Sequence, residues 1–207
     1  MDQIPALVPP SRVACPVPGT GWYAPAMRRS ILRTMMLVLT GLGGACTTNY
    51  PNQDPVGRTF PTVTGEDLEQ TSVTLPTAYR GAPALYLVGY RQNTQFDLDR
   101  WTIGLLQADF PCRIVEVPTI PGLVPSLIKG TIDDGMRSGI PKEDWASVVT
   151  LYGDAAKPVV EFTGNANPRN GRILLLDAEG TVVWFWDQGF SARRVLELSR
   201  LAGDLDS

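Results

Sequence analysis

The spacing of apolar residues changes several times along this chain and divides it into segments of different kinds. Residues 1–26 are rich in proline and glycine and show no apolar period. Residues 27–46 begin with a basic stretch, continue with a short run of apolar and small residues, and end at a cysteine. Residues 47–57 are polar, with two prolines and one glycine, whereas 58–207 alternate between apolar runs and amphipathic stretches. We therefore expect one folded domain over 58–207.

Within this predicted domain, the apolar patterns indicate strands that alternate with helices. Apolar or alternating runs of strand length lie at 60–64, 71–75, 82–90, 113–117, 147–152, 172–176 and 181–186. Helical spacing lies at 94–108, 124–137 and 191–201, with Thr94 and Ser191 as expected N-caps. The turn at 177–180 (DAEG) joins the last two strands into a hairpin. We expect an α/β fold, in which helices flank a central mixed sheet and a C-terminal β-hairpin is followed by a helix.

The helical spacing also predicts which side chains face the core. In the helix at 94–108, the expected apolar stripe consists of Phe96, Trp101, Leu105 and Leu106. In the last helix, it consists of Val195, Leu196, Leu198 and Leu201. Trp184 and Trp186 share one face of a strand, and we expect both to pack in the core.

Residues 27–46 have the features of a secretory signal peptide: a basic start, a short apolar run and small residues before a cleavage site. The apolar run is too short for a membrane span, which needs about 20 residues. The RRSILR stretch resembles a twin-arginine export signal, which favours a bacterial source. Because a signal peptide begins at the N-terminus, we interpret Met27 as the true start and 1–26 as a disordered extension from a mis-assigned start codon. The alternative is a disordered arm that precedes a buried helix.

Cys46 ends this leader after Gly-Gly-Ala, as in a bacterial lipoprotein signal, where the cysteine becomes the lipidated first residue. Leu42 lies one position too far upstream for a full match, and ordinary cleavage near Cys46 is the alternative. We expect residues 47–57 to form a flexible tether. These features predict an exported, periplasmic protein that a lipid anchors to a membrane.

The composition excludes several kinds of chemistry. The chain has no histidine, which removes Ser-His-Asp triads, Cys-His dyads and histidine-ligated metals. It has three cysteines, Cys15, Cys46 and Cys112, and no two of them form a CxxC motif. Eighteen basic against 21 acidic residues, with no basic cluster, argue against a nucleic-acid partner. We expect no cofactor, no metal site and no catalytic residue.

The order of the predicted elements resembles the thioredoxin fold. In that fold, the redox CxxC follows the first central strand at the start of the next helix. Here that position reads YRQNTQF over 90–96, without a cysteine. The position of the thioredoxin cis-proline, before the first strand of the hairpin, is matched here by Gly171, with Pro168 three residues earlier. The resemblance therefore implies a thioredoxin-like domain without the redox dithiol.

The chain also resembles a narrower family, the thioredoxin-like assembly factor of the mitochondrial ATP synthase Fo sector and its bacterial relatives. The similar segments are 60–68 (FPTVTGEDL), 87–91 (LVGYR) with Trp101, 167–177 (NPRNGRILLLD) with Gly180 and Trp184, and the helix at 191–201. The resemblance implies a role in protein assembly or chaperoning at a membrane, with a protein client or a membrane assembly intermediate as the partner.

Polar residues occupy the position of the missing redox loop. Arg91, Gln92, Asn93 and Gln95 follow a predicted central strand, and Asn167 belongs to the loop expected opposite them. Ligands of α/β proteins bind at this edge of the sheet, and an arginine fork beside a helix N-terminus suits a carboxylate or a phosphate. We take these five residues as candidate binding residues. The alternative is a solvated loop whose side chains cap the helix.

Cys112 begins a predicted strand after Pro111. We expect it to be a small buried hydrophobic residue. The alternative is a free thiol, and with it a thiol-dependent redox enzyme or peroxidase that uses Cys112. That function requires an exposed cysteine of low pKa.

Overall fold

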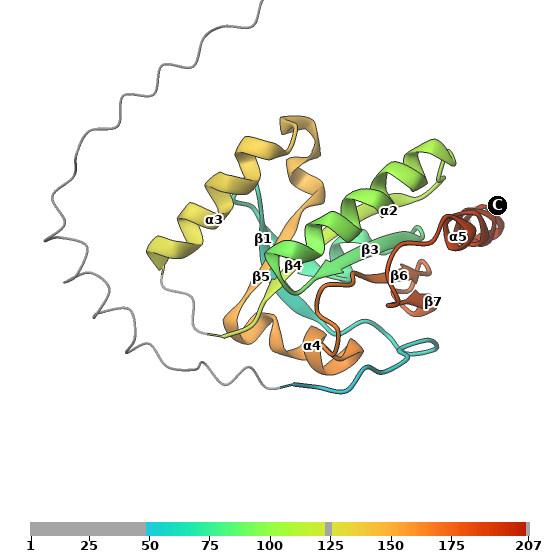
Figure 1. Cartoon of the computed structure of the whole chain (residues 1–207), viewed down its shortest axis with the longest axis horizontal. Helices are drawn as coiled ribbons and strands as arrows, with labels where there is room; N and C mark the ends of the chain where they lie inside the picture. Colours follow the sequence, from blue (N-terminus) through green and yellow to red (C-terminus); the bar gives the residue numbers. More distant parts are fainter. Residues whose placement is uncertain (1–48, 123–125, 206–207) are drawn as a thin grey trace, which may run out of the picture. The chain divides into compact units, whose positions relative to one another are not determined.

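The structure is a computed structural model that describes residues 49–122 and 126–205, and within these ranges seven strands form one mixed sheet (Figure 1). The strands are β1 (Val63–Asp67), β2 (Ser72–Leu75), β3 (Ala84–Gly89), β4 (Arg113–Ile120), β5 (Val149–Tyr152), β6 (Arg172–Leu176) and β7 (Val182–Trp186). Their order across the sheet is β2-β1-β5-β4-β3-β6-β7. The central strands β3, β4 and β5 are parallel, and the flanking strands pair antiparallel. The predicted α/β fold with a mixed sheet is confirmed.

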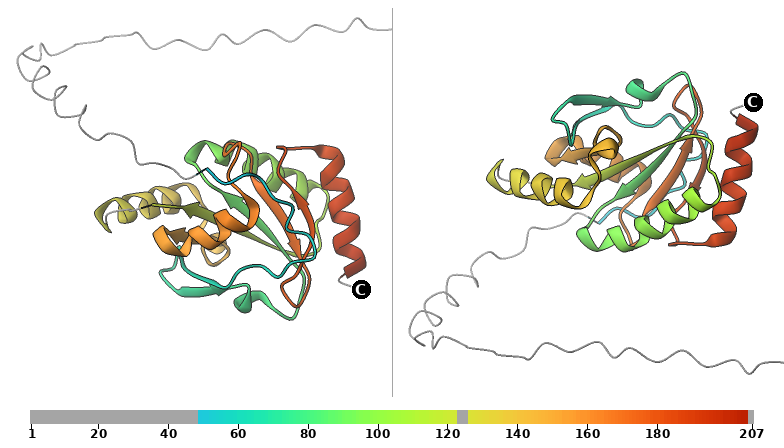
Figure 2. Two further views of the ribbon diagram at one scale, coloured as in Figure 1. Left: turned by 90° about the horizontal axis from the view of Figure 1, so that it is seen from below. Right: turned by 90° about the horizontal axis from the view of Figure 1, so that it is seen from above.

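The helices of the described ranges are α2 (Gln95–Gln107), α3 (Ser126–Gly139), α4 (Lys157–Thr163) and α5 (Ala192–Leu205). Short 3-10 turns lie at Thr77–Tyr79, Gln92–Thr94, Lys142–Ser147 and Gly153–Ala155. In Figure 1, α4 lies on the opposite side of the strands from α2, and Figure 2 shows α5 along the β6–β7 end of the sheet. None of the described helices combines the length and apolar character that a membrane-spanning helix requires.

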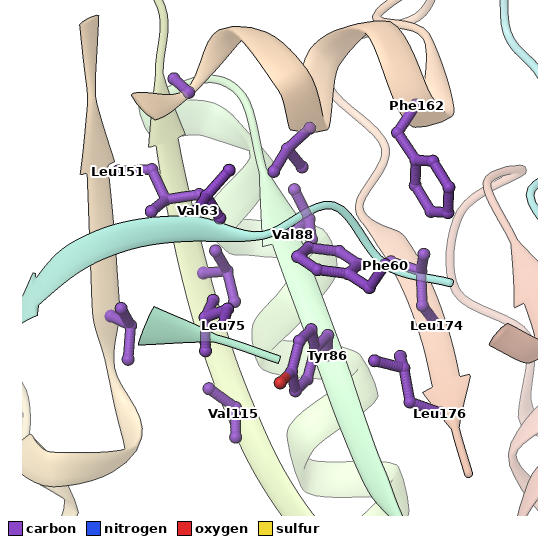
Figure 3. Packing of buried hydrophobic residues seen from close by; sticks show 14 of the residues in the cluster. Phe60, Val63, Leu75, Tyr86, Val88, Val115, Leu151, Phe162, Leu174 and Leu176 are labelled. Carbon is purple, nitrogen blue, oxygen red and sulfur yellow. The ribbon is translucent and has the colours of Figure 1, made fainter. Parts of the chain in front are cut away.

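The two faces of the sheet bury two apolar layers. Residues alternate along β3, so Tyr86 and Val88 face α4, whereas Leu85 and Leu87 face α2 and α5. On the α4 side, Phe60 lies edge-to-face against Tyr86, with ring centroids 5.0 Å apart (Figure 3). Burial of both faces explains why the central strands are continuous apolar runs in the sequence.

The outward side of α2 corrects one sequence prediction. Trp101 and Leu105 are fully buried, as expected, but Phe96 is 73% exposed and Leu106 is 67% exposed. The side of α2 that faces the sheet carries Asp97 and Leu98 in the turn before Trp101. At about 100° per residue, Phe96 and Leu106 fall outside that face. The sequence pattern therefore assigned two solvent-exposed residues, Phe96 and Leu106, to the buried side of the helix.

The last helix shows a similar difference. Val195 and Leu198 are buried against α2 and the sheet, as expected. Leu196 is 55% exposed, so its predicted place in the core is wrong. Leu201 is partly buried and packs against the same layer. The next fully buried residue after Leu198 is Ala202, which the sequence pattern did not indicate.

The first strand begins later than predicted. Residues 60–62 precede β1, and the stretch 65–67, which lies outside the predicted strand at 60–64, forms most of the strand. Gly65 explains the difference, because a Cβ at this position would lie 2.6 Å from the carbonyl oxygen of Thr150. Glycine here permits the close approach of β1 to β5. It does not mark a turn.

Residues 50–57 also differ from the flexible tether that the sequence predicted. The backbone N–H of Tyr50 donates to the Asn165 side chain at 2.8 Å, and the Asn165 N–H donates to the Tyr50 carbonyl at 3.0 Å. Further along, Gln53 N–H donates to Thr163 O at 3.1 Å and Gly57 N–H donates to Val182 O at 2.8 Å. These residues therefore belong to the domain. The predictions for 1–26, the signal peptide at 27–46 and lipidation of Cys46 lie outside the described residues.

Candidate functional site

Two loops meet at the carboxyl end of β3. One is the 3-10 turn at Gln92–Thr94, which leads into α2, and the other precedes β6. The Thr94 hydroxyl donates to the Pro168 carbonyl at 2.7 Å and accepts the backbone N–H of Arg91 at 3.2 Å. Thr94 therefore makes no side-chain cap on α2, in contrast to the sequence prediction. Its hydroxyl joins the two loops instead.

Asp97 fixes the second connection between these segments. It is buried in the first turn of α2, where Oδ2 accepts the Gly171 N–H at 2.9 Å and Oδ1 accepts the Phe190 N–H at 2.7 Å. A buried carboxylate is stable when hydrogen bonds satisfy its oxygens. Sequence reasoning missed this role of Asp97. Its position four residues before Trp101, on the buried face, was the available signal.

Gly171 allows α2 to approach the start of β6. A Cβ at this position would lie 2.3 Å from the Leu98 Cδ2 atom of α2. The residue that matches the position of the thioredoxin cis-proline is thus a point of close helix–strand packing.

Arg172, the first residue of β6, is a fully buried charged side chain that sequence reasoning missed. Its Nη2 donates to Asn52 Oδ1 at 3.0 Å and to the Ala166 carbonyl at 2.5 Å, and Nη1 donates to the Asn170 carbonyl at 3.0 Å. Burial lowers the pKa of this guanidinium, an effect that nearby Tyr90 and Asp187 oppose. Arg172 thereby holds the 166–170 loop and the N-terminal segment together. A charged residue at the start of an apolar run was the signal in the sequence.

All five candidate binding residues lie at this edge and are exposed: Arg91, Gln92, Asn93, Gln95 and Asn167. We call them the polar rim. Asn167 has a φ of 52°, a left-handed conformation that asparagine tolerates better than most residues. The side chain of Gln95 donates to Asp99 Oδ1 at 2.9 Å, so it is partly engaged along α2. The loops that carry the rim are held in place by the buried side chains of Thr94, Asp97 and Arg172.

Glu116 lies close to the rim, on the face of β4 that α2 covers. It pairs with Leu87 of β3 and is half-buried. Burial raises the pKa of Glu116 to about 6, with a further increase from the charge of Asp99, while a hydrogen bond from Gln95 opposes the shift. This carboxyl group is therefore titratable at mildly acidic pH.

Cys112 lies at the opposite end of the sheet from the rim. It immediately precedes Arg113, which pairs with Ala84 at the start of β3, whereas the rim follows Gly89 at the end of the same strand. The six residues of β3 separate the two places by about 17 Å. Cys112 is half-buried, packs against the α2–α5 layer, and its thiol lies 3.8 Å from the Ala202 carbonyl. Its packing agrees with the predicted hydrophobic role, although burial is incomplete.

The tryptophans on β7 pack as expected but keep polar contacts. Trp184 and Trp186 are partly buried against the α2–α5 layer. Trp184 Nε1 donates to the Glu197 carboxylate at 3.1 Å, and Trp186 Nε1 donates to the Gly189 carbonyl at 2.7 Å. Trp101 lies edge-to-face against Trp184, with centroids 6.3 Å apart. Across residues 49–122 and 126–205, no cluster of three or more His, Cys, Asp or Glu side chains suits a metal ion.

No protein-family model matches the chain, and no curated protein matches it. Several solved structures resemble it. A candidate protein disulfide isomerase from Bacteroides thetaiotaomicron is 13% identical, with a TM-score of 0.51 over 77% of this chain and 94% of that one. BsSco, of the Sco family of cytochrome c oxidase assembly proteins, is 13% identical, with a TM-score of 0.51 over 74% and 98%.

A SCO1/SenC family lipoprotein from Bacillus anthracis is similar at the same level: it is 11% identical, with a TM-score of 0.50 over 76% of this chain and all of that one, 100%. At such low identity, these likenesses concern the fold. Together with the sheet order and the flanking helices, they show that the domain has a thioredoxin-like fold.

Proposed function

We propose that this protein is a non-catalytic binding module that acts as an assembly factor or chaperone in the cell envelope, where a lipid on Cys46 tethers it to a membrane. The observation that carries the proposal is the polar rim, which stands at the ligand-binding edge of a thioredoxin-like sheet on a rigid base. Cys112 is the sole cysteine of the described residues, and it lies at the other end of β3. The rim therefore offers hydrogen-bonding groups without a nucleophilic thiol from the described residues.

The chemistry of the rim suits a protein client. Arg91 presents a planar fork that can bind a carboxylate through two hydrogen bonds, and Asn93 and Asn167 can donate to and accept from a peptide backbone. Phe96 is exposed next to these residues. An exposed aromatic ring beside polar groups is typical of protein-binding surfaces. We infer that the rim binds an extended or acidic segment of its client.

The descriptions of two similar structures name related properties. BsSco is described as a member of a family of assembly proteins, and the Bacillus anthracis protein is described as a lipoprotein. The sequence resemblance to the ATP synthase Fo assembly factor family points to the same class of activity. The proposal for this chain extends to membrane protein assembly.

Site-specific photocrosslinking tests the proposal. A photoreactive amino acid replaces Asn93 in the full-length protein in its host, and a control carries it at Glu179 in the hairpin turn of the far edge. We expect discrete crosslinked proteins from position 93 that are absent from position 179. Arg91→Ala should reduce the yield at position 93 several-fold, whereas Arg80→Ala, which changes an exposed arginine away from the rim, should not. Equal crosslinks from positions 93 and 179 would contradict a client site at the rim.

The incomplete burial of Cys112 supports a second candidate, a thiol-dependent redox enzyme. That function needs a reactive thiolate. It predicts fast labelling of native Cys112 by a thiol reagent at neutral pH, and loss of activity in the cell on Cys112→Ser. The binding-module proposal predicts slow labelling relative to the urea-unfolded chain and crosslinks at position 93 that persist in the Cys112→Ser variant.

A further inference from the structure

The chain enters the domain at the edge that carries the polar rim. Tyr50 exchanges two hydrogen bonds with Asn165, in the loop that also holds Asn167. Two residues later, Asn52 accepts a hydrogen bond from Arg172, the residue at which β6 begins. The same loop joins the rim through the hydrogen bond from Thr94 to Pro168. Tyr50 therefore lies at the same edge of the sheet as the polar rim.

From this entry point, the chain runs toward the opposite edge. Gly57 pairs with Val182 near the start of β7, and Phe60 N–H donates to the Gly180 carbonyl in the hairpin turn at 2.9 Å. The segment 50–60 is therefore hydrogen-bonded to the domain at the rim edge and again at the opposite edge, which carries the hairpin turn. The entry point at Tyr50 therefore lies at the rim edge, and the hairpin turn lies at the opposite edge.

The distance available before Tyr50 is short. Four residue steps separate Cys46 from Tyr50. A fully extended chain spans about 3.5 Å per residue, so the two Cα atoms lie within about 14 Å of each other. This limit holds for any conformation of the residues between them. A lipid on Cys46 would therefore draw the Tyr50–Asn165 corner of the domain close to the bilayer surface.

We propose that the polar rim faces the membrane, with the bilayer surface as the partner of this edge. The inference rests on the lipidation of Cys46 in the proposed function and specifies where that function takes place. Phe96, which is 73% exposed beside the rim, supplies an apolar side chain that can enter the headgroup region. A client would then be bound where its chain emerges from the membrane, not in the open periplasm.

Short-range quenching tests this orientation. The full-length protein, matured in its host, is purified from membranes as a Cys112→Ser variant with one added cysteine, Asn167→Cys at the rim or Glu179→Cys at the far edge. A fluorophore on that cysteine is quenched by nitroxide headgroups in phosphatidylcholine–phosphatidylglycerol vesicles. We expect at least two-fold stronger quenching at position 167 than at 179. Equal quenching, or stronger quenching at 179, would overturn the proposal.

A spacer variant shows whether the short connection causes the orientation. Fifteen Gly/Ser residues inserted between Thr48 and Asn49 should abolish the difference between the two labels, and the same spacer after Ser207 should preserve it. A difference that survives the first insertion would refute control by the short connection. Intact mass of the same samples must show the lipid on Cys46, and an unlipidated mature chain overturns the proposal. The quenching needs no client, so failure of client crosslinking at position 93 is a separate result.

Discussion

At the scale of single residues, buried charges build the edge that carries the rim. The Asp97 carboxylate accepts two backbone N–H groups, and the Arg172 guanidinium donates to three oxygens of the surrounding loops. An unpaired buried donor or acceptor costs about 1–3 kcal/mol, and more when it is charged. Loss of either side chain would therefore release several segments together. This arrangement gives the exposed rim residues a fixed base.

Glu116 gives the protein a predicted dependence of stability on pH. Its pKa is about 6 in the folded protein, against an ordinary value of 4.5. Between these values, the folded state holds a proton that the unfolded chain has released. Stability from this group is therefore highest below pH 4.5 and falls as the pH rises to about 6. The full loss is about 2 kcal/mol.

Urea unfolding at pH 4.5 and pH 7 checks this prediction. Glutamine mimics the protonated acid, so Glu116→Gln should gain stability relative to the wild type on going from pH 4.5 to pH 7. Glu179→Gln, at an exposed position in the hairpin turn, should follow the wild type at both pH values. A Glu116→Gln variant with the same pH dependence as the wild type would show that the carboxyl group titrates normally.

Sequence reasoning located the exposed residues of the site but not its buried supports. Arg91 and Asn93 were found because they follow an apolar strand, which is a local pattern. The partners of Asp97 lie 74 and 93 residues away along the chain, and Asn52 lies 120 residues from Arg172. No local spacing encodes such contacts. A charged residue on an apolar face indicates burial, but its partner depends on the tertiary structure.

At the scale of elements, α2 has two apolar sides with different roles. Leu105 faces the core between the sheet and α5, and the adjacent Leu106 faces the solvent. Leu105→Ala should lower the free energy of unfolding by about 3 kcal/mol, because it leaves a cavity in a packed layer. Leu106→Ala should change it by less than about 0.5 kcal/mol. Urea denaturation of the two variants gives a matched comparison. Similar losses in the free energy of unfolding would support the apolar stripe predicted from the sequence.

The elements that the sequence missed depend on their surroundings. The helix α4 has seven residues, with Pro158 in its first turn, and packs Val159 and Val160 against the sheet. So short a helix is stable through packing and has little helical period of its own. The apolar runs of β3 and β6, in contrast, are buried on both faces, and this environment is visible in the sequence itself.

At the scale of the whole molecule, residues 50–57 close the domain across one face of the sheet. They link the loop before β6 to the start of β7 through backbone hydrogen bonds, and Pro55 is buried among them. The sequence predicted a tether here because polar residues and prolines are typical of linkers. Polarity did not distinguish a segment that hydrogen-bonds to the domain from one that does not. In the proposed function, these contacts shorten the connection between the domain and Cys46.

A truncation tests how far the folded unit extends. A chain of residues 58–207 lacks the Asn52 oxygen that binds Arg172 and the backbone partners of Asn165, Thr163 and Val182. At about 1 kcal/mol for each lost hydrogen bond, its free energy of unfolding should be roughly 3–5 kcal/mol below that of residues 49–207. Asn52→Ala in the longer chain should lose about 1–2 kcal/mol, because only the contacts of one side chain disappear. If both chains unfold at the same urea concentration, residues 50–57 contribute nothing to stability and the original boundary at residue 58 is correct. The short reach from Cys46 to the domain would then no longer hold, and the proposed orientation of the rim toward the membrane would lose its basis.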